Sequence, residues 1–359
     1  MEYNYNGNLA IINFFLWFIL IFVYRTEYYR ATNRKGKYDL IGIITILFCT
    51  FAFSTADTYH YEVLYNNMTL YNTCLHVEDF YFWLLSILPN NFYIWRLAIW
   101  GTATLIYIKV CKINNLDNRI VGLIFPLILL QQFAVTRGCL GITLFLLGAS
   151  ILIKRKQPNK TSYLLSVCAI VASLFLHKSL PLFIAIATLA LVPLNKKTFI
   201  ILIILFPIFR GFVIPFVFDF LGSGLFSEDT TSFATKFLEQ EKSERNILGT
   251  IRLIIDYIPK FLIFIALIKF FIFKKAQIPK NIRFFFNYSF LLFYIALLFL
   301  GQETSSFITN RTIHIMSFTL LIPFAYYLMY NNHSFTTRIA ILFLALSNLL
   351  EFMYFIYKY

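Results

Sequence analysis

The chain has 359 residues, of which 59% are hydrophobic and only 13% are charged, and its formal net charge at pH 7 is +14. Soluble domains carry about 25% charged and about 45–50% apolar residues, so this composition excludes a soluble globule. It also argues against a nucleic-acid-binding protein, because the basic residues are scattered over short loops and form no single patch.

Long apolar runs recur along the whole chain and predict a polytopic membrane protein. Runs of about 20 residues cross the hydrocarbon layer, and backbone groups in lipid must pair within the segment, so the spans are expected to be helices. The alternating pattern of a membrane β-barrel is absent. The sequence therefore predicts an all-α bundle in a single transmembrane domain, 1–359. We expect about twelve spans, at 9–24, 39–54, 92–108, 120–135, 138–153, 162–176, 180–194, 198–217, 251–272, 284–300, 312–329 and 339–357.

The basic residues predict the orientation of the bundle. Most lysines and arginines fall in loops after alternate spans, such as 25–37, 154–160 and 269–283. Short cytoplasmic loops carry the excess of lysine and arginine, so these loops are expected to be cytoplasmic. Both termini would then face outward.

Two long segments, 55–91 and 218–250, are predicted to form outer-face loops, and the second contains a possible amphipathic helix. Loops of this length are more often functional than connective. The first loop begins with Asp57, Tyr59 and Tyr61. The tyrosines fit an interfacial belt equally well, and in the functional interpretation they stack on sugar rings while Asp57 orients a base or binds sugar hydroxyls.

Two apolar runs in the middle of the chain form a predicted helical hairpin. The spans 138–153 and 162–176 are joined by a basic turn. With that turn in the cytoplasm, the far ends of both helices must lie together at the outer face. Arg137 precedes the first helix, and His177 and Lys178 follow the second. The hairpin therefore brings a guanidinium, an imidazole and an ammonium group into one layer, which is the candidate site.

Each residue of this layer has two interpretations. Arg137 either extends its side chain to the interface or binds an anion in bidentate fashion, which a helix N-terminus favours. His177 is either structural or, beside these cations, a neutral imidazole that accepts a proton. The shared depth of the two residues favours the functional interpretation.

Two further arginines lie at the predicted outer ends of other spans. Arg311 precedes the span 312–329, and His314 lies one turn deeper on the same face of that helix. Arg96 occupies the equivalent place at the start of the span 92–108. Both arginines are therefore candidates for the same anion site.

Three more basic residues, Arg210, Arg252 and Lys260, lie within or at the edges of predicted spans. Arg210 lies within 198–217 between two prolines, so we expect a buried arginine beside a kink that lines a cavity. Arg252 and Lys260 are expected at the edges of 251–272, where they could be interfacial.

Motifs for bound cofactors are missing. The sequence has no HExxH or paired metal-ligand spacing, no Walker loop and no GxSxG elbow. We therefore expect neither a metal nor a nucleotide cofactor.

These features resemble the EpsG/Wzy-like family of bacterial polysaccharide polymerases. The residues that carry the resemblance are Asp57-x-Tyr59-x-Tyr61 after the second span, Arg137-Gly138 before LGITLFLLGASIL, LFLHKS ending at Ser179, and Asn310-Arg311. The resemblance implies a GT-C/Wzy-ligase-like helical fold in the bacterial inner membrane, with the active site facing the periplasm. It also implies undecaprenyl-pyrophosphate-linked oligosaccharides as substrates, membrane lipids around the bundle and a chain-length regulator as a partner.

The chemistry of this family suits the candidate residues. The growing glycan leaves its lipid pyrophosphate and joins a hydroxyl of the next lipid-linked unit, so the energy of the reaction is already in the substrate. Arg137, Arg311 and Arg210 would bind the pyrophosphate, while His177 acts as base or orienting group, unless Asp57 is the base. The other candidates for substrate binding are Lys178, Arg96, Tyr59, Tyr61, His314 and Arg252.

Three other functions compete with this one. A lipid-linked glycan ligase uses the same chemistry with a different acceptor. A flippase for lipid-linked glycans would need charges distributed through the membrane, whereas the candidate residues gather toward one face. A membrane acyltransferase would need a cytoplasmic acyl-donor path and an inner-face histidine, and His333 is isolated.

Overall fold

The computed structural model describes residues 91–117, 120–121, 124–125, 128, 136–154, 159–176, 180–213, 247–273, 277–300, 305–331, 335 and 339–344. These residues form helices and connecting turns, and no strand occurs among them. The all-α prediction is therefore confirmed for this part of the chain.

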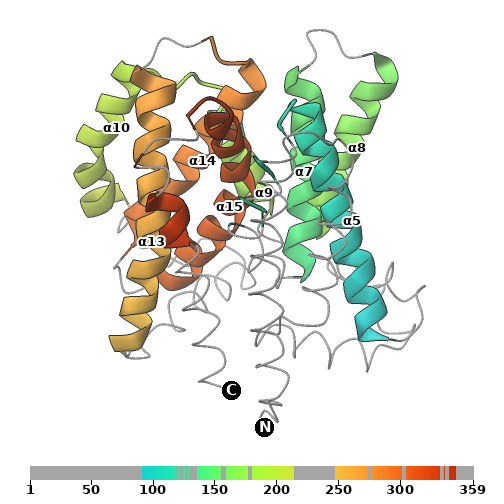
Figure 1. Cartoon of the computed structure of the whole chain (residues 1–359), viewed down its shortest axis with the longest axis horizontal. Coiled ribbons are helices and arrows are strands. Elements are labelled where there is room, and N and C mark those ends of the chain that lie inside the picture. The colour runs from blue at the N-terminus through green and yellow to red at the C-terminus, as the bar shows by residue number, and fades with distance from the viewer. Residues whose placement is uncertain are drawn as a thin grey trace, which may run out of the picture.

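The principal helices form a bundle in which successive helices run in opposite directions from α7 to α10 and again from α13 to α15 (Figure 1). They are α5 (Phe92–Ile113), α7 (Thr136–Lys154), α8 (Lys160–Leu176), α9 (Leu180–Leu189), α10 (Lys196–Ile208), α13 (Ile247–Ile268), α14 (Lys280–Phe299) and α15 (Ser305–Asn331). Two of them continue as π-helix, α10 through η3 (Phe209–Val213) and α13 through η4 (Lys269–Phe273).

Each of these helices coincides with a predicted span, from the third span onward. The spans 9–24 and 39–54 and the loop 55–91, except for its last residue, lie outside the described residues. The loop 218–250 also lies outside the described residues, up to the start of α13 at Ile247. Only scattered helical residues are described in 120–135, and 339–344 begins the last span. The number of twelve spans thus stays a prediction.

Asparagines determine where several helices begin. The Asn91 side chain accepts hydrogen bonds from the backbone N–H groups of Tyr93 and Ile94, at 2.9 and 3.2 Å. Asn195 caps α10 in the same way, and the Thr198 hydroxyl completes a capping box. Such caps satisfy N–H groups that have no partner within the helix.

One end of the bundle carries Lys112, Lys154, Lys160 and Lys196 and is here called the lysine-rich end. A buried polar network holds this end together. The Asn114 side chain, just after α5, donates to the Ser150 hydroxyl of α7 at 2.9 Å. Asn281 of α14 donates to the Asn114 side-chain oxygen at 2.7 Å. Lys154 adds bonds to the Ile113 carbonyl and the Asn115 side chain. Three helices that are remote in sequence are therefore joined at this end.

Helices α7 and α8 form the predicted hairpin and approach closely through glycines. A Cβ atom built on Gly148 would lie 2.7 Å from the Ser166 carbonyl oxygen and 2.6 Å from a side-chain carbon of Ile170. A Cβ atom on Gly141 would lie 3.4 Å from the Cβ atom of Leu176, at the other end of the interface. Small residues let the backbones of membrane helices pack at short distance.

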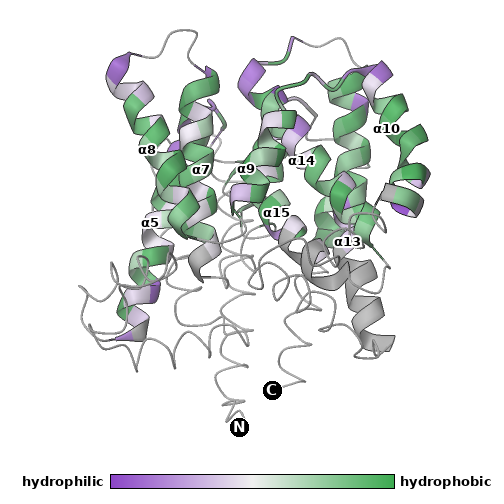
Figure 2. Ribbon diagram, turned by 180° about the vertical axis from the view of Figure 1, so that it is seen from behind, coloured by the Kyte–Doolittle hydropathy of each residue, from purple (hydrophilic) through white to green (hydrophobic). Residues whose placement is uncertain are grey.

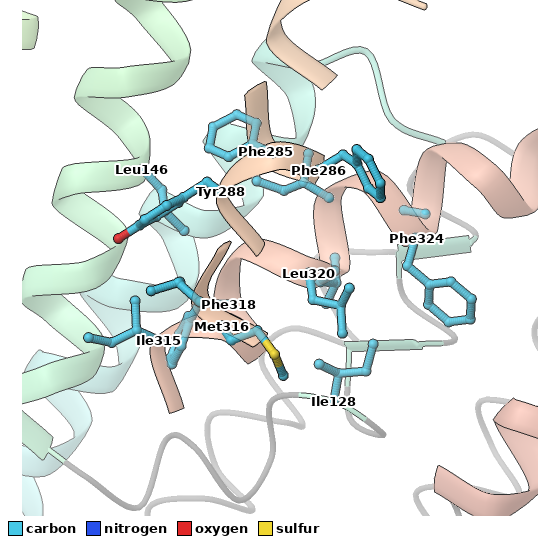
Figure 3. Packing of buried hydrophobic residues seen from close by; sticks show 14 of the residues in the cluster. Ile128, Leu146, Phe285, Phe286, Tyr288, Ile315, Met316, Phe318, Leu320 and Phe324 are labelled. Atoms are coloured by element: carbon cyan, nitrogen blue, oxygen red, sulfur yellow. The ribbon is translucent and has the colours of Figure 1, made fainter. Parts of the chain in front are cut away.

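Helix α15 lies in the centre and is buried along most of its length. Figure 3 shows Phe318 of α15 in one apolar cluster with Leu146 of α7 and Tyr288 of α14. The Tyr107 hydroxyl of α5 donates to the Phe318 carbonyl at 2.6 Å, and Tyr288 donates to the Phe183 carbonyl of α9 at 2.9 Å. Aromatic side chains with one polar atom thus link α15 and α14 to their neighbours.

The outward surface of the bundle is apolar. Figure 2 shows hydrophobic residues along the helices, with hydrophilic ones near the helix ends. Large side chains such as Leu164 of α8, Ile204 of α10 and Phe212 of η3 are exposed. Three described helices are long and apolar enough to cross a membrane, at Tyr93–Ile113, Lys280–Phe299 and Thr312–Tyr330. Exposed apolar surface of this extent is expected of a protein surrounded by lipid.

Candidate functional site

The candidate site lies at the end of the bundle opposite the lysine-rich end, here called the arginine end. It contains the starts of α5, α7, α13 and α15, and the last residues of α8, η3 and α14. The hairpin geometry agrees with the sequence analysis at this point. Leu176, the last residue of α8, and Leu180, the first of α9, both lie against the place where a Cβ atom of Gly141 would be. Gly141 follows Arg137 by one turn of α7.

Four helices that begin at the arginine end each carry an arginine within their first two turns. These residues are Arg96, Arg137, Arg252 and Arg311. None of the four helices has an acidic residue in its first turn. The positive end of a helix dipole disfavours a nearby cation, so helix stability does not explain this placement. Arginines gathered at the positive ends of several helices do suit an anionic ligand.

Arg96 is the arginine whose surroundings are described most fully. Its side chain is only 1% exposed, and its guanidinium carbon lies 4.0 Å from the ring centre of Trp100, one turn further along α5. This arrangement is a cation–π interaction, which is worth about 2 kcal/mol or more when desolvated. Arg96 therefore faces the protein interior and not the membrane interface.

The first half of α15 brings polar residues into the buried centre of the bundle. His314 is 8% exposed and its ring contacts Phe318 edge to face, with centroids 5.5 Å apart. Thr309 is also buried, and its hydroxyl has no hydrogen-bond partner among the described residues. Other buried hydroxyls of α15 bond back to their own helix, as Ser317 does to the Ile313 carbonyl. Thr309 is therefore an additional candidate that the sequence analysis missed.

The expectation for Arg210 was wrong in one respect. Its side chain is exposed, and it lies in the π-helix η3 that follows Pro207 and α10. Its guanidinium donates to the Leu300 carbonyl at the end of α14, at 2.8 Å. A cation at a helix C-terminus is stabilising, so this bond joins the arginine-end termini of two helices. The residue does lie at the expected end of the bundle.

The expectation for Lys260 was also wrong. Its side chain is 5% exposed and lies well inside α13, directly after Pro259, whereas an edge position had been expected. The helix begins at Ile247, several residues earlier than the predicted span, which moves Lys260 toward the middle. A buried cation within a membrane helix is generally functional or paired.

Several predicted site residues cannot be placed. Asp57, Tyr59, Tyr61, His177 and Lys178 lie outside the described residues. For Arg137, Arg252 and Arg311 the helix positions are described without their side chains. Within the described ranges, no three histidine, cysteine, aspartate or glutamate residues are grouped so as to hold a metal ion.

A family model, that of the EpsG family, matches residues 38–359. The chain belongs to the EpsG family. Comparison with curated proteins and with solved structures gave no match. Membership in the EpsG family indicates a membrane-embedded protein with a polysaccharide-polymerase type of function. The match includes all described helices, and therefore every arginine of the arginine end.

Proposed function

We propose that this EpsG family member joins undecaprenyl-pyrophosphate-linked oligosaccharide repeat units at the outer face of the bacterial inner membrane. The observation that carries the proposal is the placement of arginines at the arginine end. Helices from separate parts of the sequence begin there, each with an arginine in its first two turns. A lipid-linked pyrophosphate is an anion at the membrane surface, which such a site suits.

The arginines would act on the leaving group. When the glycosidic bond to the donor lipid breaks, negative charge develops on the pyrophosphate. Donors already oriented toward that charge stabilise the transition state, and one such donor is worth about 2.7–4 kcal/mol. Arg137 and Arg311 are the proposed donors. Arg210 is the third, because η3 places its guanidinium at the arginine end, beside the end of α14.

A base must remove the proton from the acceptor hydroxyl. His177 is the proposed base or orienting group, since it directly follows α8 in the hairpin that carries Arg137. Asp57 is the alternative base. General-base catalysis contributes roughly 10²–10⁴ in rate. The remaining proposed contacts to the glycan and lipid come from Lys178, Arg252, His314, Tyr59 and Tyr61.

Reconstitution gives a direct test. The full chain, purified in detergent, would be incubated with lipid-linked repeat units in chelator and without nucleotide. A ladder of lipid-linked products, increasing by one repeat unit, is the expected result. A single transfer to a different acceptor would show a ligase instead, and movement of the substrate across vesicles without new bonds would show a flippase. A chain-length regulator is the expected partner, and adding it should change the length of the ladder and not its existence.

A further inference from the structure

Helices α5 and α15 meet at one defined contact in the middle of the bundle. The Tyr107 and Phe318 rings pack edge to face, with centroids 6.1 Å apart. The Tyr107 hydroxyl also donates to the Phe318 carbonyl at 2.6 Å. Both side chains are fully buried. This contact therefore fixes which face of each helix is turned toward the other.

Both helices begin at the arginine end, so positions before this contact can be matched. Trp100 precedes Tyr107 by two turns and lies on the same face of α5. Arg311 precedes Phe318 by two turns and lies on the same face of α15. Two turns are about 10.5 Å in each helix. Trp100 and Arg311 thus each precede the contact by two turns of their own helix, toward the arginine end.

Trp100 is one of the largest fully buried side chains of the described helices. Its side chain is 0% exposed, and its indole nitrogen has no hydrogen-bond acceptor in the described part of the chain. By contrast, Tyr107, Tyr288 and Tyr294 each donate to a backbone carbonyl of another helix. An indole N–H can only donate, so the missing partner must be an acceptor.

The charge around Trp100 indicates what kind of acceptor fits. The guanidinium of Arg96 lies over the face of the ring, 4.0 Å from its centre. The edge of an aromatic ring, where the N–H lies, is already the positive part of its quadrupole. A cation on the face and a positive edge together favour an oxygen that carries negative charge.

We infer that Trp100 is a substrate-binding residue, whose indole N–H donates to an oxygen of the lipid-linked diphosphate at the arginine end. Arg96 supplies a positive charge on the face of the same ring. The inference rests on the proposed function for the identity of the ligand. It adds a neutral donor to a site that was otherwise made of arginines.

The test measures binding of inorganic pyrophosphate to the full chain in detergent, by titration calorimetry. Trp100→Phe removes the N–H and keeps an aromatic ring over which Arg96 can stack. Benzothienylalanine at position 100 is the closer replacement, because sulfur takes the place of the N–H and the ring keeps its size. Tyr107→Phe is the matched control, since it removes a donor from the same helix face that already has a partner. Glucuronate serves as a second anion.

Loss of one hydrogen bond to a charged group should weaken pyrophosphate binding about tenfold or more in both position-100 variants. Tyr107→Phe should bind as the wild type does, and glucuronate binding should not depend on position 100. The inference is overturned if benzothienylalanine leaves the affinity for pyrophosphate unchanged in a correctly folded protein. It is also overturned if the wild type binds no pyrophosphate, or if position 100 affects only glucuronate. The calorimetry measures binding without turnover. If the polymerase assay failed, the measured effect of position 100 on pyrophosphate affinity would therefore still be valid.

Discussion

Gly148 permits a direct test of how closely α7 and α8 approach. In Gly148→Ala the new methyl group would lie 2.7 Å from the Ser166 carbonyl oxygen, whereas ordinary van der Waals contact begins at 3.4 Å. The carbonyl belongs to the backbone of α8 and cannot rotate away. The two helices must therefore separate by several tenths of an ångström at this point.

The size of the effect follows from the packing around the glycine. A gap of about 0.5–1 Å forfeits a quarter to a half of the attraction between atoms that were in contact. Overpacking a close interface costs about 1–3 kcal/mol. Gly101 supplies the matched control, because nothing lies within 4 Å of a Cβ atom built there. Gly101→Ala should therefore stabilise α5 by about 0.5–1 kcal/mol, the usual gain of alanine over glycine within a helix.

The two variants are compared by the free energy of unfolding in mixed micelles, from reversible titration with a denaturing detergent. The expected result is opposite signs, with Gly148→Ala less stable and Gly101→Ala more stable than the wild type. The reasoning is refuted if Gly148→Ala is as stable as Gly101→Ala. Since the same hairpin carries Arg137, the polymer yield of Gly148→Ala should fall together with its stability.

Three further predictions concern the site and the opposite end of the bundle. Arg137→Lys keeps the charge and loses the planar pair of donors, so the polymerisation rate should fall by about 10²–10³; product ladders of normal length and rate would contradict a bidentate role. His177→Ala should slow turnover by about 10²–10⁴ and flatten its pH dependence, and an unchanged pH–rate profile would exclude proton transfer by this imidazole. Asn281→Leu leaves the buried Asn114 oxygen without its donor, which should cost about 1–3 kcal/mol of unfolding free energy. Micelle denaturation curves identical to the wild type would show that this network contributes nothing.

The sequence analysis predicted the helices well because apolar length and basic loops are strong local signals. The hairpin of α7 and α8 was predicted from two apolar runs and the basic turn between them. The end of α5 was placed too early, because the predicted span 92–108 stopped before Lys109 and Lys112. Both lie in the last turns of the helix. Lysines near a helix end are readily accommodated, since their long side chains reach the interface.

The candidate site was predicted less completely, because burial is not a local property. Prolines around Arg210 suggested a buried side chain, but α10 lies at the periphery of the bundle and has no buried residue. Lys260 has an ordinary apolar neighbourhood in the sequence, and only the packing of α13 shows that it is buried. Trp100 could have been noticed one turn after Arg96. Its missing acceptor, however, becomes visible only when the neighbouring helices are in place.

The polar network at the lysine-rich end also constrains how the bundle can deform. Asn114 ties the end of α5 to α7 and to α14, so these helices cannot slide past one another there. Any widening between them at the other membrane face has to be a rotation about this fixed point. Helix α5 has 22 residues, a length of about 33 Å, so tilting it by about 10° would displace its far end by about 6 Å. A modest swing of one helix would thus widen the bundle at the arginine end, while the lysine-rich end stays closed.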